Sequence, residues 1–93
     1  MAPIDDPILI RFRAALAAAF GERIERVVLY GSRARGDARP DSDYDIAIFL
    51  QDFGGIGEEM GPIAEIETDI LLDTGLVINA LPFAPARTTN GRV

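Results

Sequence analysis

Two aspartates, Asp43 and Asp45, stand where a polar loop enters an apolar run, "YDIAIFL" at 44–50. Successive side chains of a strand point to opposite faces, so these carboxylates would lie side by side while Tyr44 points the other way. Two carboxylates that close raise the pKa of one of them unless a cation neutralises both. Mg²⁺ is commonly held by one or two carboxylates together with substrate phosphates. The spacing therefore predicts a Mg²⁺ site, although a solvated acidic strand end would have the same pattern.

A second cluster, Gly31, Ser32, Arg33 and Arg35, follows the preceding apolar run, "ERVVLY". A glycine directly after a strand allows a sharp turn and the close approach of a ligand. Ser32 can begin a helical turn whose free N–H groups face an anion, and the two arginines add guanidinium groups suited to phosphate oxygens. No Gly-Lys-Ser/Thr follows, so this is not a Walker P-loop. Together the two clusters predict a site where a nucleoside triphosphate meets Mg²⁺.

The composition restricts the chemistry further. The chain of 93 residues contains no histidine and no cysteine, so acid–base and metal chemistry must use carboxylates and a hard metal. Its 48% hydrophobic and 26% charged residues are typical of one globular domain, predicted over 1–93. The net charge of −6 argues against duplex DNA as a partner, and no apolar run is long enough to span a membrane. We therefore expect a cytoplasmic protein.

The elements that must position these residues follow from periodicity and from turn residues. Apolar spacing predicts helices at 7–20 and 62–73, and short apolar runs predict strands at 25–30, 44–50 and 76–81. The remaining segments are predicted as one helical turn at 32–36, a loop at 37–42, a glycine-rich mobile connection at 51–61 and a tail from Pro82 onward. The order predicts an α/β (α+β) fold with a core at about 4–81, in which helices pack on a small mixed sheet of about three strands.

The spacing Gly31-Ser32, ten residues, then Asp43-x-Asp45 resembles the signature of the polymerase-β-type nucleotidyltransferase superfamily. Within that superfamily, the short length and "GSRARGDARPDSDYDIAI" are most similar to the minimal nucleotidyltransferases. Members of that group are encoded beside HEPN-domain toxins and act as their antitoxins.

The resemblance implies specific roles. Ser32 and the backbone around it would hold the β- and γ-phosphates of ATP, and Asp43 and Asp45 would bind Mg²⁺ and align the α-phosphate. The acceptor would be a tyrosine hydroxyl of a HEPN toxin, bound in a hetero-oligomer and silenced by the addition of AMP.

The resemblance is incomplete at one position. Full catalytic sites of the superfamily carry a third carboxylate on the following strand, where this chain has Asn79 in "LVINAL". Asparagine can give an oxygen to a metal but cannot act as a base. An active adenylyltransferase and an antitoxin that neutralises its partner by binding alone therefore both remain open. A small-molecule nucleotidyltransferase ranks third, because 93 residues leave little room for an acceptor domain.

Overall fold

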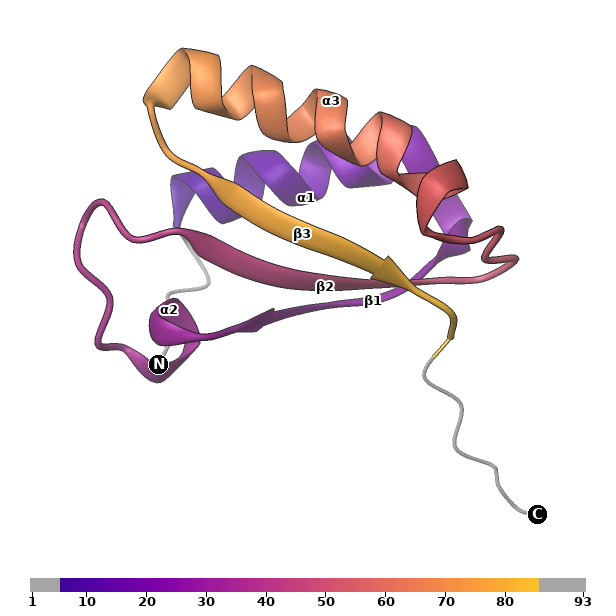
Figure 1. Cartoon of the computed structure of the whole chain (residues 1–93), viewed down its shortest axis with the longest axis horizontal. Helices are drawn as coiled ribbons and strands as arrows, with labels where there is room; N and C mark the ends of the chain where they lie inside the picture. The colour runs from indigo at the N-terminus through magenta and orange to yellow at the C-terminus, as the bar shows by residue number, and fades with distance from the viewer. Residues whose placement is uncertain (1–5, 86–93) are drawn as a thin grey trace.

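The computed structural model describes residues 6–85, which form one layer of helices on one sheet (Figure 1). The elements in chain order are α1 (Pro7–Phe20), the short 3₁₀ helix η1 (Gly21–Arg23), β1 (Ile24–Tyr30), α2 (Ser32–Arg35), β2 (Tyr44–Leu50), α3 (Ile56–Thr74) and β3 (Ile78–Phe83). This order confirms the predicted fold class, a mixed three-stranded sheet with helices packed on it.

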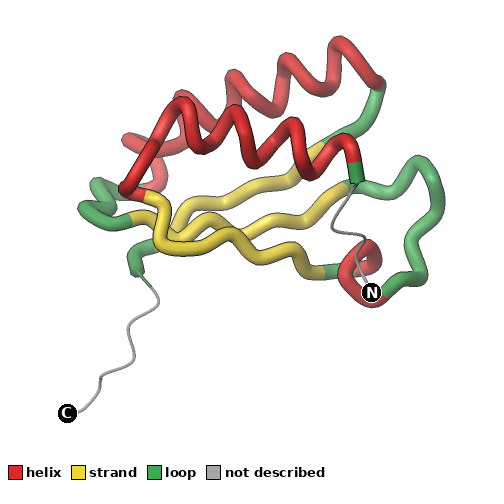
Figure 2. Tube along the Cα trace, turned by 180° about the vertical axis from the view of Figure 1, so that it is seen from behind, coloured by secondary structure: helices red, strands yellow, loops and turns green. Residues whose placement is uncertain are grey.

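The central strand of the sheet is β2. It pairs antiparallel with β1 and parallel with β3, in the order β1-β2-β3. In this register Tyr30, Asp45 and Asn79 lie in one row across the three strands. The row lies where β1 ends and where β2 and β3 begin, and α2 with the loop after it lies at the same end of the sheet (Figure 2).

The two long helices lie on the same side of the sheet (Figure 1). Alternate residues of β2 are buried in one core with residues of both helices. The buried core is made of β2 and β3 residues together with residues from both helices: Phe12, Leu16, Phe20, Tyr44, Ile46, Ile48, Leu50, Ile63, Ile70, Ile78 and Ala80. Since burial of apolar side chains is the main driving force of folding, the helices are fixed over this face. The other face of the sheet carries the remaining residues of each strand.

No described helix covers that other face, which we call the uncovered face. It presents Arg26, Val28 and Tyr30 of β1, Asp45, Ala47 and Phe49 of β2, and Asn79, Leu81 and Phe83 of β3. The rings of Phe49 and Phe83 stack with centroids 5.5 Å apart, and the Arg26 guanidinium lies 5.2 Å from the centroid of the Phe49 ring. Leu81 is 44% exposed, so this face remains open to a partner or ligand.

The second long helix begins earlier than its sequence predicts. We expected a mobile connection over 51–61 and a helix from Pro62, but α3 starts at Ile56 and contains Pro62. The Glu59 side chain is buried, pairs with Arg23 and accepts a hydrogen bond from the Gly54 amide at 3.0 Å. Pro62 is exposed, so the carbonyl that it leaves unbonded one turn earlier can be solvated. These contacts fix a segment whose glycines suggested mobility.

The last strand also differs from its prediction. It covers Ile78–Phe83 instead of 76–81, so Pro82, expected in a tail, is a buried strand residue. The Ala80 amide points away from β2 and donates to Glu67 of α3 at 2.8 Å. Because strand residues alternate, Pro82 has the same orientation, and this is an edge position where a missing N–H breaks no ladder bond. The rest of the predicted tail, from residue 86, lies outside the described residues.

Candidate active site

Asp43 and Asp45 lie at the entrance of the central strand. Asp43 is the exposed residue immediately before β2, and Asp45 is the half-buried second residue of that strand. Tyr44 between them is only 2% exposed and packs in the core under the helices. The two carboxylates therefore share the uncovered side of the sheet, where a ligand can reach both.

Gly31 brings the end of β1 into direct contact with one of these carboxylates. Its φ is +77°, and a Cβ added at this position would overlap the Asp45 carboxylate. The residue that follows, Ser32, is half-buried and begins α2, whose first-turn N–H groups have no partner inside the helix. The turn predicted to hold phosphate thus lies against the predicted metal site because residue 31 has no side chain.

Asn79 reaches the other carboxylate. Its Nδ2 donates to Asp43 Oδ2 at 2.9 Å, and its backbone pairs with Asp45 across the parallel ladder. The position where the resemblance implies a third carboxylate therefore does belong to the cluster. Here it supplies an amide that orients Asp43.

The donor set suits a hard divalent cation. Two carboxylates and the amide oxygen of Asn79 are oxygen ligands of the kind that Mg²⁺ takes, with substrate phosphates completing its coordination. Among residues 6–85, no group of three or more His, Cys, Asp or Glu side chains is placed to hold a metal. Any Mg²⁺ bound here would therefore depend on Asp43, Asp45 and the ligand's own phosphates.

Arg33 is not located where we expected a phosphate ligand. Its Nε donates to the Ser42 carbonyl at 2.9 Å and its Nη2 to the Pro40 carbonyl at 3.0 Å. Its guanidinium lies 3.9 Å from the centroid of the Tyr44 ring. Because that ring faces the helices, Arg33 is directed to the side of β2 opposite the two carboxylates. Its position does not support the predicted role in phosphate binding.

Arg35 remains exposed at the end of α2. Its Nε lies 3.4 Å from Oδ2 of Asp37, and both side chains are more than half exposed. An ion pair of this kind is weak in water, so the guanidinium is available to an anion. Arg35 keeps its predicted role as a candidate phosphate contact.

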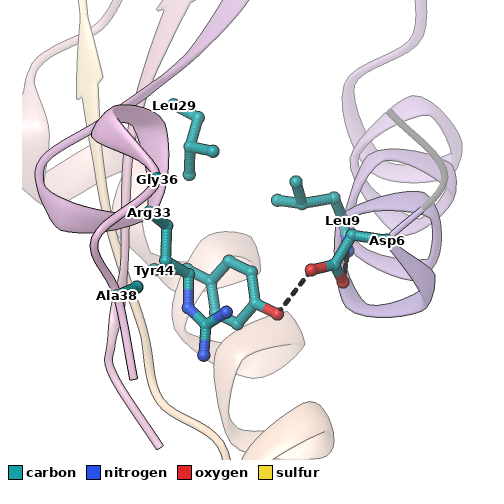
Figure 3. Close-up of a pocket in the computed structure, with 7 residues that line it drawn as sticks. All are labelled: Asp6, Leu9, Leu29, Arg33, Gly36, Ala38 and Tyr44. Carbon is teal, nitrogen blue, oxygen red and sulfur yellow. Dashed lines mark hydrogen bonds between the residues drawn. The ribbon is translucent and has the colours of Figure 1, made fainter. Parts of the chain in front are cut away.

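A pocket of about 200 Å³ lies behind the site, between α1 and α2 (Figure 3). In it the Tyr44 hydroxyl donates to Asp6 Oδ2 at 2.8 Å, while Asp6 Oδ1 accepts from the Ile8 amide at 2.8 Å. Burial, followed by the Asp6 hydrogen bond, raises the pKa of Tyr44 to about 12. Asp6 was not among the predicted site residues, although an aspartate before Pro7 is a helix N-cap signal. The pocket therefore contains the hydrogen bond that holds β2, the strand of Asp43 and Asp45, against the start of α1.

No helix among the described residues is long and apolar enough to cross a membrane. No solved structure matches the chain. Two curated proteins of Methanocaldococcus jannaschii do. The one named "Putative protein adenylyltransferase MJ0604" is 33% identical over 78 residues, which are 83% of this chain and 71% of that protein. The one named "Putative protein adenylyltransferase MJ0141" is 31% identical over 52 residues, 56% of this chain and 52% of that protein.

The family model described as "Polymerase beta, Nucleotidyltransferase" matches residues 16–82. The matched segment contains the Gly31–Ser32 turn, both carboxylates and Asn79, together with most of the chain. The protein therefore belongs to the polymerase beta nucleotidyltransferase family.

Proposed function

We propose that this protein is a Mg²⁺-dependent adenylyltransferase that transfers AMP from ATP to a tyrosine hydroxyl of a HEPN-type toxin, and so acts as its antitoxin. One observation carries the proposal: Asp43 and Asp45 share the uncovered side of the sheet, with Gly31 packed against Asp45 and Asn79 bonded to Asp43. The names of the two relatives support a protein as acceptor. The HEPN partner follows from the resemblance of the Gly31–Asp45 segment.

Within this proposal each group has a task. When bound, Mg²⁺ would neutralise the carboxylates and triphosphate and polarise the α-phosphate. Asp43 and Asp45 hold the ligand at the entrance of β2, and the turn at Ser32 offers N–H groups to its terminal phosphates. Because helices cover the opposite face, the acceptor must approach from the uncovered face.

The transfer is a displacement at the α-phosphorus. A bond forms between the acceptor oxygen and the α-phosphorus, the bond to the bridging oxygen breaks, and pyrophosphate leaves. The acceptor's proton is released to solvent, because the Asn79 amide cannot accept it. Catalysis then depends on positioning and on charge neutralisation.

A second function is favoured by one observation. The third position of the cluster is Asn79, whose Nδ2 already donates a hydrogen bond to the Asp43 carboxylate. An antitoxin that neutralises its partner by binding alone, without catalysis, would not need a carboxylate at this position. We therefore keep the binding-only antitoxin as the alternative.

The deciding experiment is an intact-mass spectrum of the partner toxin after incubation with this protein, Mg²⁺ and ATP. We expect the partner to gain the mass of one or more AMP units. The same incubation with the Asp43→Asn/Asp45→Asn double variant should give no gain, because the Mg²⁺ ligands are lost. A wild-type sample with no gain whose two proteins still co-elute would establish the binding-only alternative.

A further inference from the structure

We infer that Arg33 is a positioning residue, which holds the strand entrance that carries Asp43 and Asp45 at a fixed place relative to the Ser32 turn. The inference rests on the proposed function, since it concerns the same Mg²⁺–ATP site. It assigns to Arg33 a task different from phosphate binding.

The first support is the bonding of the loop before Asp43. Besides the Ser42 and Pro40 carbonyls, Arg33 Nη2 lies 3.4 Å from the Arg39 carbonyl, so one side chain gathers three carbonyls of this loop. The loop is closed on itself as well, because the Ser42 amide donates to the Arg39 carbonyl at 3.0 Å. The planar guanidinium thus fixes the chain up to the residue that precedes Asp43.

The second support is the packing of the guanidinium on Tyr44 (Figure 3). The ring is held on one side by Arg33, and its hydroxyl is held by Asp6, the N-cap of α1. Tyr44 lies between the two carboxylates in the chain. A ring fixed from both directions therefore fixes the backbone from which both carboxylates project.

The third support is the location of Arg33 in α2. That helix starts at Ser32, so the arginine connects the turn proposed for phosphate with the loop and strand proposed for Mg²⁺. The Gly31–Asp45 contact joins the same two parts on the uncovered face. Arg33 joins these two parts on the helix-covered side of the sheet, away from the face proposed for the ligand.

This arrangement requires arginine. A lysine ammonium is a point charge on a flexible stem and cannot donate in one plane to several carbonyls while lying flat on a ring. Residues that orient metal ligands without touching the metal typically change metal affinity by about 10- to 100-fold when they are replaced.

The test measures, by calorimetry, the Mg²⁺ concentration that gives half-maximal ATP binding to the full chain. For Arg33→Ala, Arg33→Lys and Tyr44→Leu we expect an increase on the order of tenfold. Tyr44→Phe, which keeps the ring, should show a much smaller increase. The Arg33→Ala/Tyr44→Leu double variant should show a smaller increase than the product of the two single increases, because both changes remove the contact between the guanidinium and the ring.

The matched control is Arg11→Ala, which removes an exposed arginine paired with Asp73 on the helical side and should leave the titration unchanged. Circular dichroism shows whether each variant folds. If Arg33→Ala does not fold, the variants Arg33→Lys and Tyr44→Leu are enough to test the inference. An Arg33→Lys variant that behaves as wild type would overturn the inference in favour of a charge contact with phosphate. An unchanged Mg²⁺ requirement in Tyr44→Leu would overturn it as well.

The binding titration separates this inference from the proposed function. A wild-type protein that binds Mg²⁺–ATP but transfers no AMP would refute the transferase and leave the role of Arg33 standing. A wild-type protein that binds no Mg²⁺–ATP would overturn both.

Discussion

The contact between Gly31 and Asp45 joins the two parts of the candidate site at the level of single atoms. Because Gly31 has a positive φ and no side chain, the end of β1 can lie directly against the Asp45 carboxylate. Asp45 is therefore confined between a turn and the neighbouring strand. The exact residue type at position 31 matters for the geometry of the carboxylate pair.

For Gly31→Ala we expect two separable effects. The added Cβ is strained at this φ, which should lower the free energy of unfolding by about 1 kcal/mol. It must also displace the Asp45 carboxylate, so Mg²⁺-dependent ATP binding should be lost in protein that is still folded. Urea unfolding and calorimetry measure the two effects.

The matched control is Gly21→Ala. Gly21 has a φ of +58°, and a Cβ there would meet nothing within 4 Å, so the backbone strain is similar without the overlap. Equal ATP binding by the two variants would contradict the role given to the Gly31–Asp45 contact.

Alternation and spacing predicted much of the site at this scale. The shared face of Asp43 and Asp45 and the opposite direction of Tyr44 follow from strand geometry, whereas the place of Asn79 in the site was implied by the family resemblance. The environment of Arg33 could not be predicted, because a long side chain can turn to either side of a sheet. Only the carbonyls of residues 39, 40 and 42 decide it.

Among the elements, α3 holds two glutamates whose environments shift their pKa in opposite directions. Burial raises the pKa of Glu67, whose carboxylate accepts from the Ala80 amide. The hydrogen bond from Arg23 lowers the pKa of Glu59. Since a raised carboxyl pKa stabilises the fold below the unfolded pKa and a lowered one stabilises it above, the two residues act at different pH.

Glu67→Gln is expected to raise the melting temperature at pH 7. Glutamine can still accept from the Ala80 amide, and the variant removes a half-buried charge whose cost appears as pH rises through the raised pKa. Below the unfolded carboxyl pKa of about 4.3 the wild-type side chain is protonated in both states, so the difference should vanish. Thermal melts between pH 3 and pH 7 measure this.

Glu59→Gln provides the opposite comparison in the same melts. Its stabilising charge is present above the unfolded pKa and is lost as pH falls through the lowered folded pKa. The variant should melt lower at pH 7, by an amount that shrinks in acid. If both variants shifted the melting temperature at pH 7 in the same direction, the opposite pKa shifts given to Glu59 and Glu67 would be wrong.

The limits of sequence prediction at this scale lie in α3 and β3. The first turns of α3 contain glycines and Pro62, whose low helix propensity predicted a loop. Helix propensity is a weak guide where tertiary contacts fix the backbone. Arg23, thirty-six positions from Glu59, supplies that contact. Pro82 likewise ended the predicted strand early, since the sequence does not reveal which strand lies at an edge.

Across the whole molecule, the order of elements was enough to predict the fold class. Two helices with one apolar stripe each and three short strands have few ways to bury their apolar faces. The sequence did not reveal that both long helices lie on one side, which leaves the other face of the sheet without a covering helix among the described residues.

Ligand binding to the native state should stabilise the whole fold. We expect Mg²⁺ and ATP together to raise the melting temperature, with a gain of about 2.7 kcal/mol when ATP is at one hundred times its dissociation constant. ATP without Mg²⁺, or Mg²⁺–ATP added to the Asp43→Asn/Asp45→Asn variant, should give little shift. A full shift in that variant would place the nucleotide elsewhere.

The outer edge of β3 has a consequence for the behaviour of the protein at high concentration. Exposed strand edges are templates on which another chain can add a strand, the first step of β-aggregation. On β3 the Ala80 donor is taken by Glu67, and Pro82 has none to offer. Extension of the sheet, whether by a second molecule or by fibril growth, is therefore hindered along β3 at residues 80 and 82 and is expected on the β1 side.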